Sequence, residues 1–405
     1  MTRSALRVAL PLSVLLLPAC GDDSEVGASA SGSDSSALSG GDSGAEGGDP
    51  GGGEGGGEGG EGGEGGEPGQ LTAGEWRDLD HWDFWLGLLS KPELAAYQDT
   101  WRFFTTQRFP VVVTSDGVPL ADASVTLLDG EDQPIWRART DIHGQAELFA
   151  SLYQDEGQGP FAIQVDSSSD QKIVDDARPG ATKTLVDLPG AQPPPALDLM
   201  FVIDTTGSMG DELEYIQTEL ADVISRVQEQ VGPDVLLRLS VNFYRDEGDA
   251  YVVRPFPFTT DIDQAITDLG AQSFDGGGDT PEAVQAGLAD AIDAHDWSES
   301  AAARLCFLVL DAPPHQDDQA LTSIQDSVRS FAARGVRLIP LAASGVDQST
   351  EFMLRFYAIS TGATYTFLTD HSGIGAPHLE PTIGDYDVEL LNDLMVRLIS
   401  EALTP

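Results

Sequence analysis

The sequence predicts an α/β domain with a doubly wound, mostly parallel sheet, preceded by a small β-sandwich and a short helical segment. Three observations predict this order. Continuous apolar runs alternate with amphipathic segments after residue 196, short runs of β-forming residues alternate with turn pairs over 106–188, and aromatic and leucine residues recur at helical spacings over 71–105. A chain of 405 residues that is 40% hydrophobic has enough apolar surface for two or three domains.

The first residues, 1–20, are typical of a secretory signal. Arg3 and Arg7 precede an apolar run at 8–17 that is too short to span a bilayer. The letters LPAC that end at Cys20 resemble a bacterial lipobox. The resemblance implies a lipoprotein signal peptide and lipidation of Cys20, which would anchor the protein to a membrane of the bacterial cell envelope on the extracytoplasmic side. An ordinary signal peptide with a chance cysteine is the alternative.

Residues 21–70 contain no aromatic residue, lysine or arginine and are rich in Gly, Ser, Glu and Asp. Such a composition cannot bury enough apolar surface to offset chain entropy, so the tract is predicted to be a disordered tether. It holds only twelve of the 67 acidic residues behind the net charge of −46, so the folded part is strongly acidic as well. This charge argues against nucleic acid and anionic lipid surfaces as partners, and it attracts divalent cations.

Residues 71–105 hold four of the six tryptophans and are predicted to be helical, with Pro92 at the start of a second helix. The aromatic cluster either packs on a neighbouring domain or forms an exposed binding surface.

Residues 106–188 predict several short strands, because turn pairs such as Asp116-Gly117 and His143-Gly144 interrupt β-forming residues. This stretch resembles the carboxypeptidase-regulatory-like and Cna-B-like β-sandwich family, whose modules act as spacers or contact surfaces. A stiff Pro-rich linker is predicted at 189–196.

Residues 197–405 alternate strand and helix signals. Continuous apolar runs between amphipathic segments predict parallel strands covered on both faces. They are 197–204, 236–244, 304–311, 336–342 and 363–368. Ligands of such a sheet gather beyond the carboxyl ends of its strands, near the point where the strand order reverses.

Asp204 and Asp311 each end one of these apolar runs, so their carboxylates are expected to meet at that edge of the sheet. Thr206 and Ser208 follow Asp204 at two-residue steps and can present their hydroxyls on the same side. Carboxylate and hydroxyl oxygens are hard ligands that suit Mg²⁺ or Ca²⁺, whereas zinc favours histidine and cysteine.

Three stretches resemble the parts of a metal-ion-dependent adhesion site in a von Willebrand factor A-like domain: DTTGSM at 204–209, GGGDTPEA at 276–283 and LVLDAPPH at 308–315. The resemblance implies a metal site, held by Asp204, Thr206, Ser208, Thr280 and Asp311. The implied cofactor is Mg²⁺ or another divalent cation such as Ca²⁺ or Mn²⁺, and an acidic residue of a protein partner would complete its coordination.

Asp, Thr and Ser also cap helices, so each motif alone has a structural reading, and a folded domain with a metal-free site is a further alternative. His315 is expected to shape its loop, and His378 is expected in a surface loop. Cys306 lies within an apolar run and is expected to be a buried, unreactive thiol. Ser208 has no neighbouring base in the sequence, and no HExxH, GxSxG or GxxxxGK(S/T) motif occurs, so neither an enzyme nor a small-molecule substrate is expected. A hydrolytic enzyme is a third hypothesis, and it would require catalytic groups that the sequence does not show.

The sequence therefore predicts a lipid-anchored envelope protein that binds a protein partner through a divalent cation. A structural envelope component, in which the metal only stabilises the domain, is the alternative.

Overall fold

The structure is a computed structural model that describes residues 67–153, 158–278 and 280–405. The expected signal peptide, Cys20 and most of the expected tether therefore lie outside the described residues. Within them, no helix is both long and apolar enough to cross a membrane.

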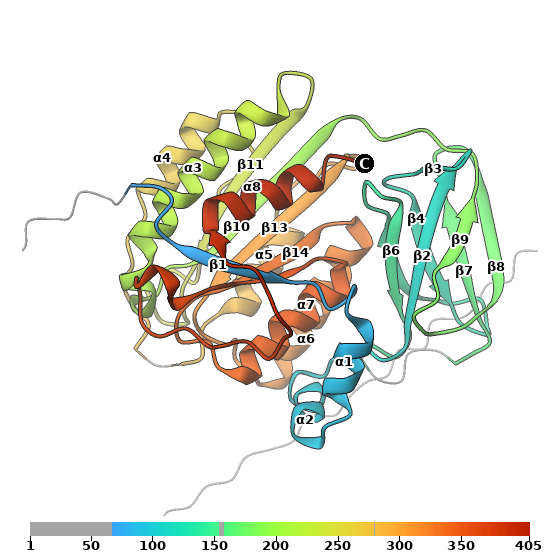
Figure 1. Ribbon diagram of the computed structural model, residues 1–405, viewed down its shortest axis with the longest axis horizontal. Coiled ribbons are helices and arrows are strands. Elements are labelled where there is room, and N and C mark those ends of the chain that lie inside the picture. Colours follow the sequence, from blue (N-terminus) through green and yellow to red (C-terminus); the bar gives the residue numbers. More distant parts are fainter. Residues whose placement is uncertain (1–66, 154–157, 279) are drawn as a thin grey trace, which may run out of the picture. The chain divides into compact units, whose positions relative to one another are not determined.

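The largest sheet in the described part of the chain has eight strands in the order β12-β11-β10-β13-β14-β15-β1-β16 (Figure 1). The strands are β1 (Thr72–Trp76), β10 (Ala196–Asp204), β11 (Leu236–Tyr244), β12 (Val253–Arg254), β13 (Ala303–Leu310), β14 (Arg337–Ala342), β15 (Tyr365–Leu368) and β16 (Glu389–Leu390). The neighbours from β11 to β15 run parallel, and β12, β1 and β16 are antiparallel additions at the edges. The fold is α/β with a mixed sheet.

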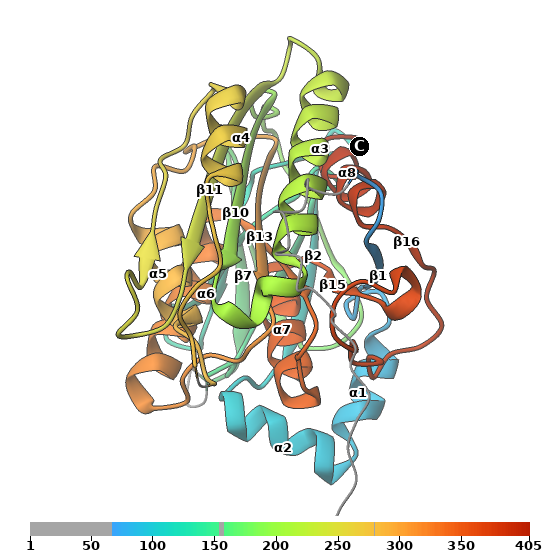
Figure 2. The same ribbon diagram turned by 90° about the vertical axis from the view of Figure 1, so that its left-hand side faces the viewer.

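Helices cover both faces of this sheet (Figures 1 and 2). One face carries α3 (Leu213–Val231), α4 (Ile262–Gly270) and α8 (Leu391–Glu401), and the other carries α5 (Val284–Asp293), α6 (Asp318–Arg334) and α7 (Gln348–Thr361). The side chains of Asp317 and Asp347 cap the N-termini of α6 and α7, and the left-handed glycines Gly335 and Gly362 end the same helices.

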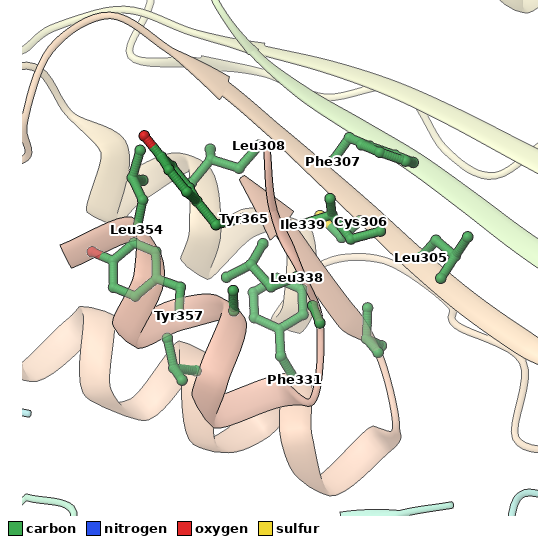
Figure 3. Close-up of a cluster of buried hydrophobic side chains, with 14 of the residues drawn as sticks. Leu305, Cys306, Phe307, Leu308, Phe331, Leu338, Ile339, Leu354, Tyr357 and Tyr365 are labelled. Atoms are coloured by element: carbon green, nitrogen blue, oxygen red, sulfur yellow. The ribbon is translucent and has the colours of Figure 1, made fainter. Parts of the chain in front are cut away.

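The central strands form because they are apolar on both sides. Every residue of β10 and β13 is buried, as expected for parallel strands between two helical layers. Figure 3 shows side chains of β13 and β14 together with those of α6 and α7. Cys306 lies in this core with a buried thiol, and burial raises its pKa well above the usual range, as expected of an inert cysteine.

The expected helical segment 71–105 begins with a strand, which is a correction. β1 inserts between β15 and β16, with Ala73 paired to both Leu368 and Glu389. Five residues are too few for a periodicity signal that could compete with the aromatic helical spacing downstream. As a consequence, the chain enters the main sheet before the small sheets begin.

Two helices follow, α1 (Trp82–Leu89) and α2 (Pro92–Trp101), with Pro92 in the first turn as expected. Trp85 is fully buried against Phe352 and Phe356 of α7, and Trp101 donates a hydrogen bond to the Ser349 carbonyl at 2.8 Å. The aromatic cluster therefore packs within the chain.

Residues 108–187 form two four-stranded sheets. Their strands are β2 (Arg108–Ser115), β3 (Val118–Pro119), β4 (Ser124–Leu128), β5 (Pro134–Arg139), β6 (Gln145–Phe149), β7 (Phe161–Asp166), β8 (Gln171–Ala177) and β9 (Thr184–Asp187). Contacts of Phe109 with Phe161 and of Trp136 with Phe149 join the sheets. At the turn after Asp141, Gly144 has φ +72°, and a Cβ there would lie 2.2 Å from the Val113 carbonyl oxygen, so only glycine fits.

Candidate metal centre

The loop that follows β10 brings three of the predicted ligands into contact. The backbone N–H and the hydroxyl of Thr206 donate to Asp204 Oδ1 at 2.9 and 2.7 Å. Thr206 Oγ1 lies 3.2 Å from Ser208 Oγ. Asp204 and Thr206 are fully buried, whereas Ser208 is exposed, so the oxygens lead from the interior to the surface. Thr206 precedes a short 3₁₀ helix but makes no side-chain cap to it, so its hydroxyl serves the carboxylate.

Asp311 lies next to this loop because β10 and β13 are parallel neighbours. Ile203 pairs with Val309, so Asp204 and Asp311 both stand at the carboxyl ends of their strands, where the strand order reverses. Burial, and then the charge of Asp311, raise the pKa of Asp204 to about 7, while the Thr206 hydrogen bonds oppose the rise. The described residues include no arginine or lysine that pairs with Asp204. Two carboxylates thus meet at one buried place.

The donor set fits a hard cation. Asp204 Oδ2 is buried and receives no protein hydrogen bond, and the phenol of Tyr244, also buried, lies near the same carboxylate. A buried acceptor without a donor costs free energy that a cation would offset. In the described part of the chain, no three His, Cys, Asp or Glu side chains converge closely enough to hold a metal. A site here therefore depends on the hydroxyls of Thr206 and Ser208 as much as on carboxylates.

Thr280, the fifth predicted ligand, lies between two anchored points of its loop. On one side, the Gly207 N–H donates to the Gly276 carbonyl at 3.2 Å, and on the other, the Glu282 N–H donates to the Pro313 carbonyl at 3.0 Å. The Thr280 side chain is exposed, and residue 279 lies outside the described residues. Among the hydrogen bonds of the described residues, none joins Thr280 to the other four. The structure thus brings four predicted ligands together and places the fifth in the adjoining loop.

Glu282 is a site residue that the sequence reasoning missed. It is 2% exposed, and its Oε2 receives no hydrogen bond from the protein. Burial, and then the charges of Asp204 and Asp246, raise the pKa of Glu282 to about 8. In the sequence it reads as an ordinary acidic residue near the start of a helix, because Pro281 precedes it and an amphipathic pattern follows.

The loops around the site are tied to one another. Asp249 Oδ2 accepts from the Gly277 N–H at 3.0 Å, and His315 Nε2 lies 2.8 Å from Asp246 Oδ1. His315 therefore shapes its loop, as expected. Gly276 has φ +81°, and a Cβ there would lie 2.4 Å from the Asp249 carboxylate, so a larger residue would disrupt the loop.

On the other flank, a buried histidine links α3 to the C-terminal loop. His378 Nε2 lies 2.9 Å from Glu212 Oε1, and its Nδ1 lies 2.8 Å from Asp370 Oδ1. Glu212 Oε2 also accepts from the Ser344 N–H at 3.3 Å, at the end of β14. The loop at 371–377 is largely exposed, as expected of a surface loop, but the imidazole of His378 that follows it is only 4% exposed. The sequence could not show this, because Glu212 is distant from His378 in the chain and Asp370 lies in an ordinary polar stretch.

A family model for the von Willebrand factor A domain matches residues 198–373. All five predicted ligands lie within this range. A viral protein described as an ariadne-like RING finger protein, from Acanthamoeba polyphaga mimivirus, is 27% identical over 184 residues. The aligned part covers 42% of this chain and 18% of that protein, so the chain spans less than a fifth of the relative's length. The α/β fold and the strand-end positions of the predicted ligands agree with this match to the von Willebrand factor A model over residues 198–373.

Proposed function

We propose that this protein binds a protein partner through a divalent cation at the carboxyl edge of its von Willebrand factor A domain. Domains of this family commonly mediate protein–protein interactions. The observation that carries the proposal is the buried, unpaired Oδ2 of Asp204 beside Asp311 and two hydroxyls. The residues that would hold the cation are Asp204, Thr206, Ser208, Thr280 and Asp311.

Mg²⁺ is the proposed cofactor, with Ca²⁺ or Mn²⁺ as substitutes, because all five side chains offer oxygen. When bound, the cation supplies an electrophilic position for a carboxylate of the partner. Thr206 and Ser208 contribute neutral oxygens, so only the carboxylates of the set oppose the charge of the ion. Ser208 is the exposed end of this set, which suits it to a position beside an incoming acidic side chain.

The proposed location is the extracytoplasmic side of the bacterial cell envelope, with the lipidated Cys20 as anchor and residues 21–70 as tether. The lipobox resemblance and the composition of the tract support it. The described chain passes from Glu67 directly into β1, so such a tether would attach to the main sheet. We further infer that the two small sheets are the β-sandwich expected for residues 106–188.

The test compares the full chain with Asp204→Asn. Titration calorimetry with MgCl₂ and a pull-down from a bacterial envelope extract, each repeated with EDTA, give the two readouts. We expect wild type to bind Mg²⁺ and to retain a partner only without EDTA, and Asp204→Asn to lose both while its circular dichroism is unchanged. Asp263→Asn, on the exposed surface near the start of α4, is the matched control.

A different result would favour the structural alternative. If EDTA lowers the melting temperature of the protein while the partner stays bound, the cation only stabilises the loops and association uses another surface. If neither wild type nor Asp263→Asn binds Mg²⁺, the proposed cation site is wrong.

A further inference from the structure

Glu282 has a buried carboxylate with no counter-charge. Its backbone is held in place because its N–H donates to the Pro313 carbonyl and because Glu282 pairs with Pro314 in an isolated bridge. Its Oε2 is inaccessible to solvent and receives no hydrogen bond from the protein. An ionised carboxylate in such a place is costly unless a cation or several donors accompany it.

The neighbours of Glu282 increase this cost. A Cβ placed on Gly277 would lie 3.2 Å from Glu282 Oε1 and 3.2 Å from Thr206 Cβ, so Glu282 and Thr206 flank the same glycine. Carboxylates of the neighbouring segments, from Asp204, Asp246, Asp311 and Asp249, lie near enough to repel a negative charge on Glu282. Among the described ion pairs, none gives Glu282 a lysine, arginine or histidine partner. In the same loops, His315 is engaged with Asp246, and Arg245 donates to the Ser273 carbonyl at 2.6 Å.

A buried carboxylate that faces other carboxylates points to a missing positive charge. Glu282 reaches the same loop junction as Thr206, so a cation bound to Asp204 and Thr206 would also be near Glu282. Its contribution is electrostatic, and Gly277 is small enough to let the carboxylate approach Thr206. A glutamine there would keep the shape of the side chain and remove the charge.

We propose that Glu282 is a further residue of the cation centre, a positioning carboxylate that raises the affinity of the site for a divalent cation. This inference rests on the proposed function. Glu282 acts on the ion through its negative charge and through its contact with the glycine loop beside Thr206. Its negative charge adds to those of Asp204 and Asp311 without a third carboxylate ligand, which favours a divalent over a monovalent ion.

The test is titration calorimetry of the full chain with MgCl₂ and with MnCl₂, at fixed pH and ionic strength. We expect Glu282→Gln to weaken the affinity for both ions by about 10-fold or more, since carboxylates that support metal ligands contribute about 10- to 100-fold. Glu282→Asp, which keeps the charge, should retain more of the affinity than Glu282→Gln. Glu214→Gln, at an exposed position in the first turn of α3, is the matched control and should bind as wild type does.

Thermal unfolding in EDTA separates the charge from a structural role. Glu282→Gln should melt no lower than wild type without the cation, because it loses only repulsion, and it should gain less from saturating Mg²⁺. A clearly lower melting temperature in EDTA would overturn the inference, because Glu282 would then support the fold itself. Equal Mg²⁺ affinity of Glu282→Gln and wild type, with Asp204→Asn inactive, would overturn the inference alone. Failure of wild type to bind Mg²⁺ would overturn the proposed function.

Discussion

Arg304 of β13 and Asp122, which precedes β4, form an ion pair of 2.9 Å in which the side chains are 3% and 6% exposed. The Asp122 carboxylate also accepts a hydrogen bond from Arg139 at 2.9 Å. Arg304 donates a further hydrogen bond from Nε to the Ser298 carbonyl. A central strand of the main sheet is thus bonded directly to the region of the small sheets. The guanidinium of Arg329 on α6 lies over the ring of Trp136 and adds a second contact of the same kind. The Pro-rich linker therefore joins regions that are also in direct contact.

Asp122→Asn should destabilise the protein strongly. The change leaves the buried guanidinium of Arg304 without its counter-charge, and removal of one partner from a buried pair costs roughly 3–5 kcal/mol. Asparagine tolerates the left-handed backbone of Asp122 at φ +61°, so the loss reports on charge. Urea denaturation measures the free energy of unfolding. Asp116→Asn is the control, because Asp116 also has positive φ but is exposed. Equal stability of the two variants would mean that the pair contributes little.

Glu219→Gln should weaken the attachment of the N-terminal segment. The buried Glu219 carboxylate on α3 accepts backbone N–H groups from Gly69, Gln70 and Leu71 at 2.7–3.1 Å. Hydrogen bonds to a charged group contribute about 1.5–3 kcal/mol, so glutamine should lower the free energy of unfolding by that order. Proteolysis near residue 70 should also become faster. Glu229→Gln, exposed on the same helix, should change neither quantity. A stable, protease-resistant Glu219→Gln would show that β1 is held by strand pairing alone.

The strands of the main sheet could be predicted because their physics is local. The continuous apolar runs that end in Asp204 and Asp311 correspond to β10 and β13, whose residues are all buried. By contrast, α7 gives no amphipathic signal in the sequence, because the helix is buried on every side from Thr350 to Thr361 and lacks a polar face. β1 could not be predicted either, since its five residues form a strand through pairing with β15 and β16, which are distant in the sequence.

The cation centre divides in the same way. Asp204, Thr206 and Ser208 are close in the chain, so spacing alone predicted their contact, and strand-end position predicted the proximity of Asp311. Glu282 could not be found in this way, because its burial depends on how the glycine loop folds over the strand ends. The predicted role of Thr280 remains a prediction.

The stability of the protein should depend on pH through His378. Burial would lower the pKa of this imidazole, but the hydrogen bonds to Glu212 and Asp370 outweigh burial and raise the pKa. Because the folded pKa is above the unfolded value of about 6.5, the contribution is fully present below about pH 6.5 and is lost as pH rises through the folded pKa. We expect the difference in unfolding free energy between wild type and His378→Gln to be larger at about pH 6 than at about pH 9.

Urea denaturation at both pH values checks this expectation. His143→Gln changes an exposed histidine and should leave the pH dependence of wild type intact. A His378→Gln protein with the same pH dependence as wild type would show that the imidazole does not carry its charge in the pair with Glu212.

Thr206→Val should impair the cation centre without a change of shape. Thr206 is fully buried. Its hydroxyl donates to Asp204 Oδ1 at 2.7 Å and lies 3.2 Å from Ser208 Oγ. Valine removes the oxygen, so calorimetry with MgCl₂ should show an affinity lowered by about 10-fold or more, the range seen when groups that orient metal ligands are removed. Thr206→Ser restores a hydroxyl and should bind Mg²⁺ nearly as wild type does. If the valine and serine variants bind Mg²⁺ equally well, the hydroxyl is not a ligand, and the centre depends on the carboxylates.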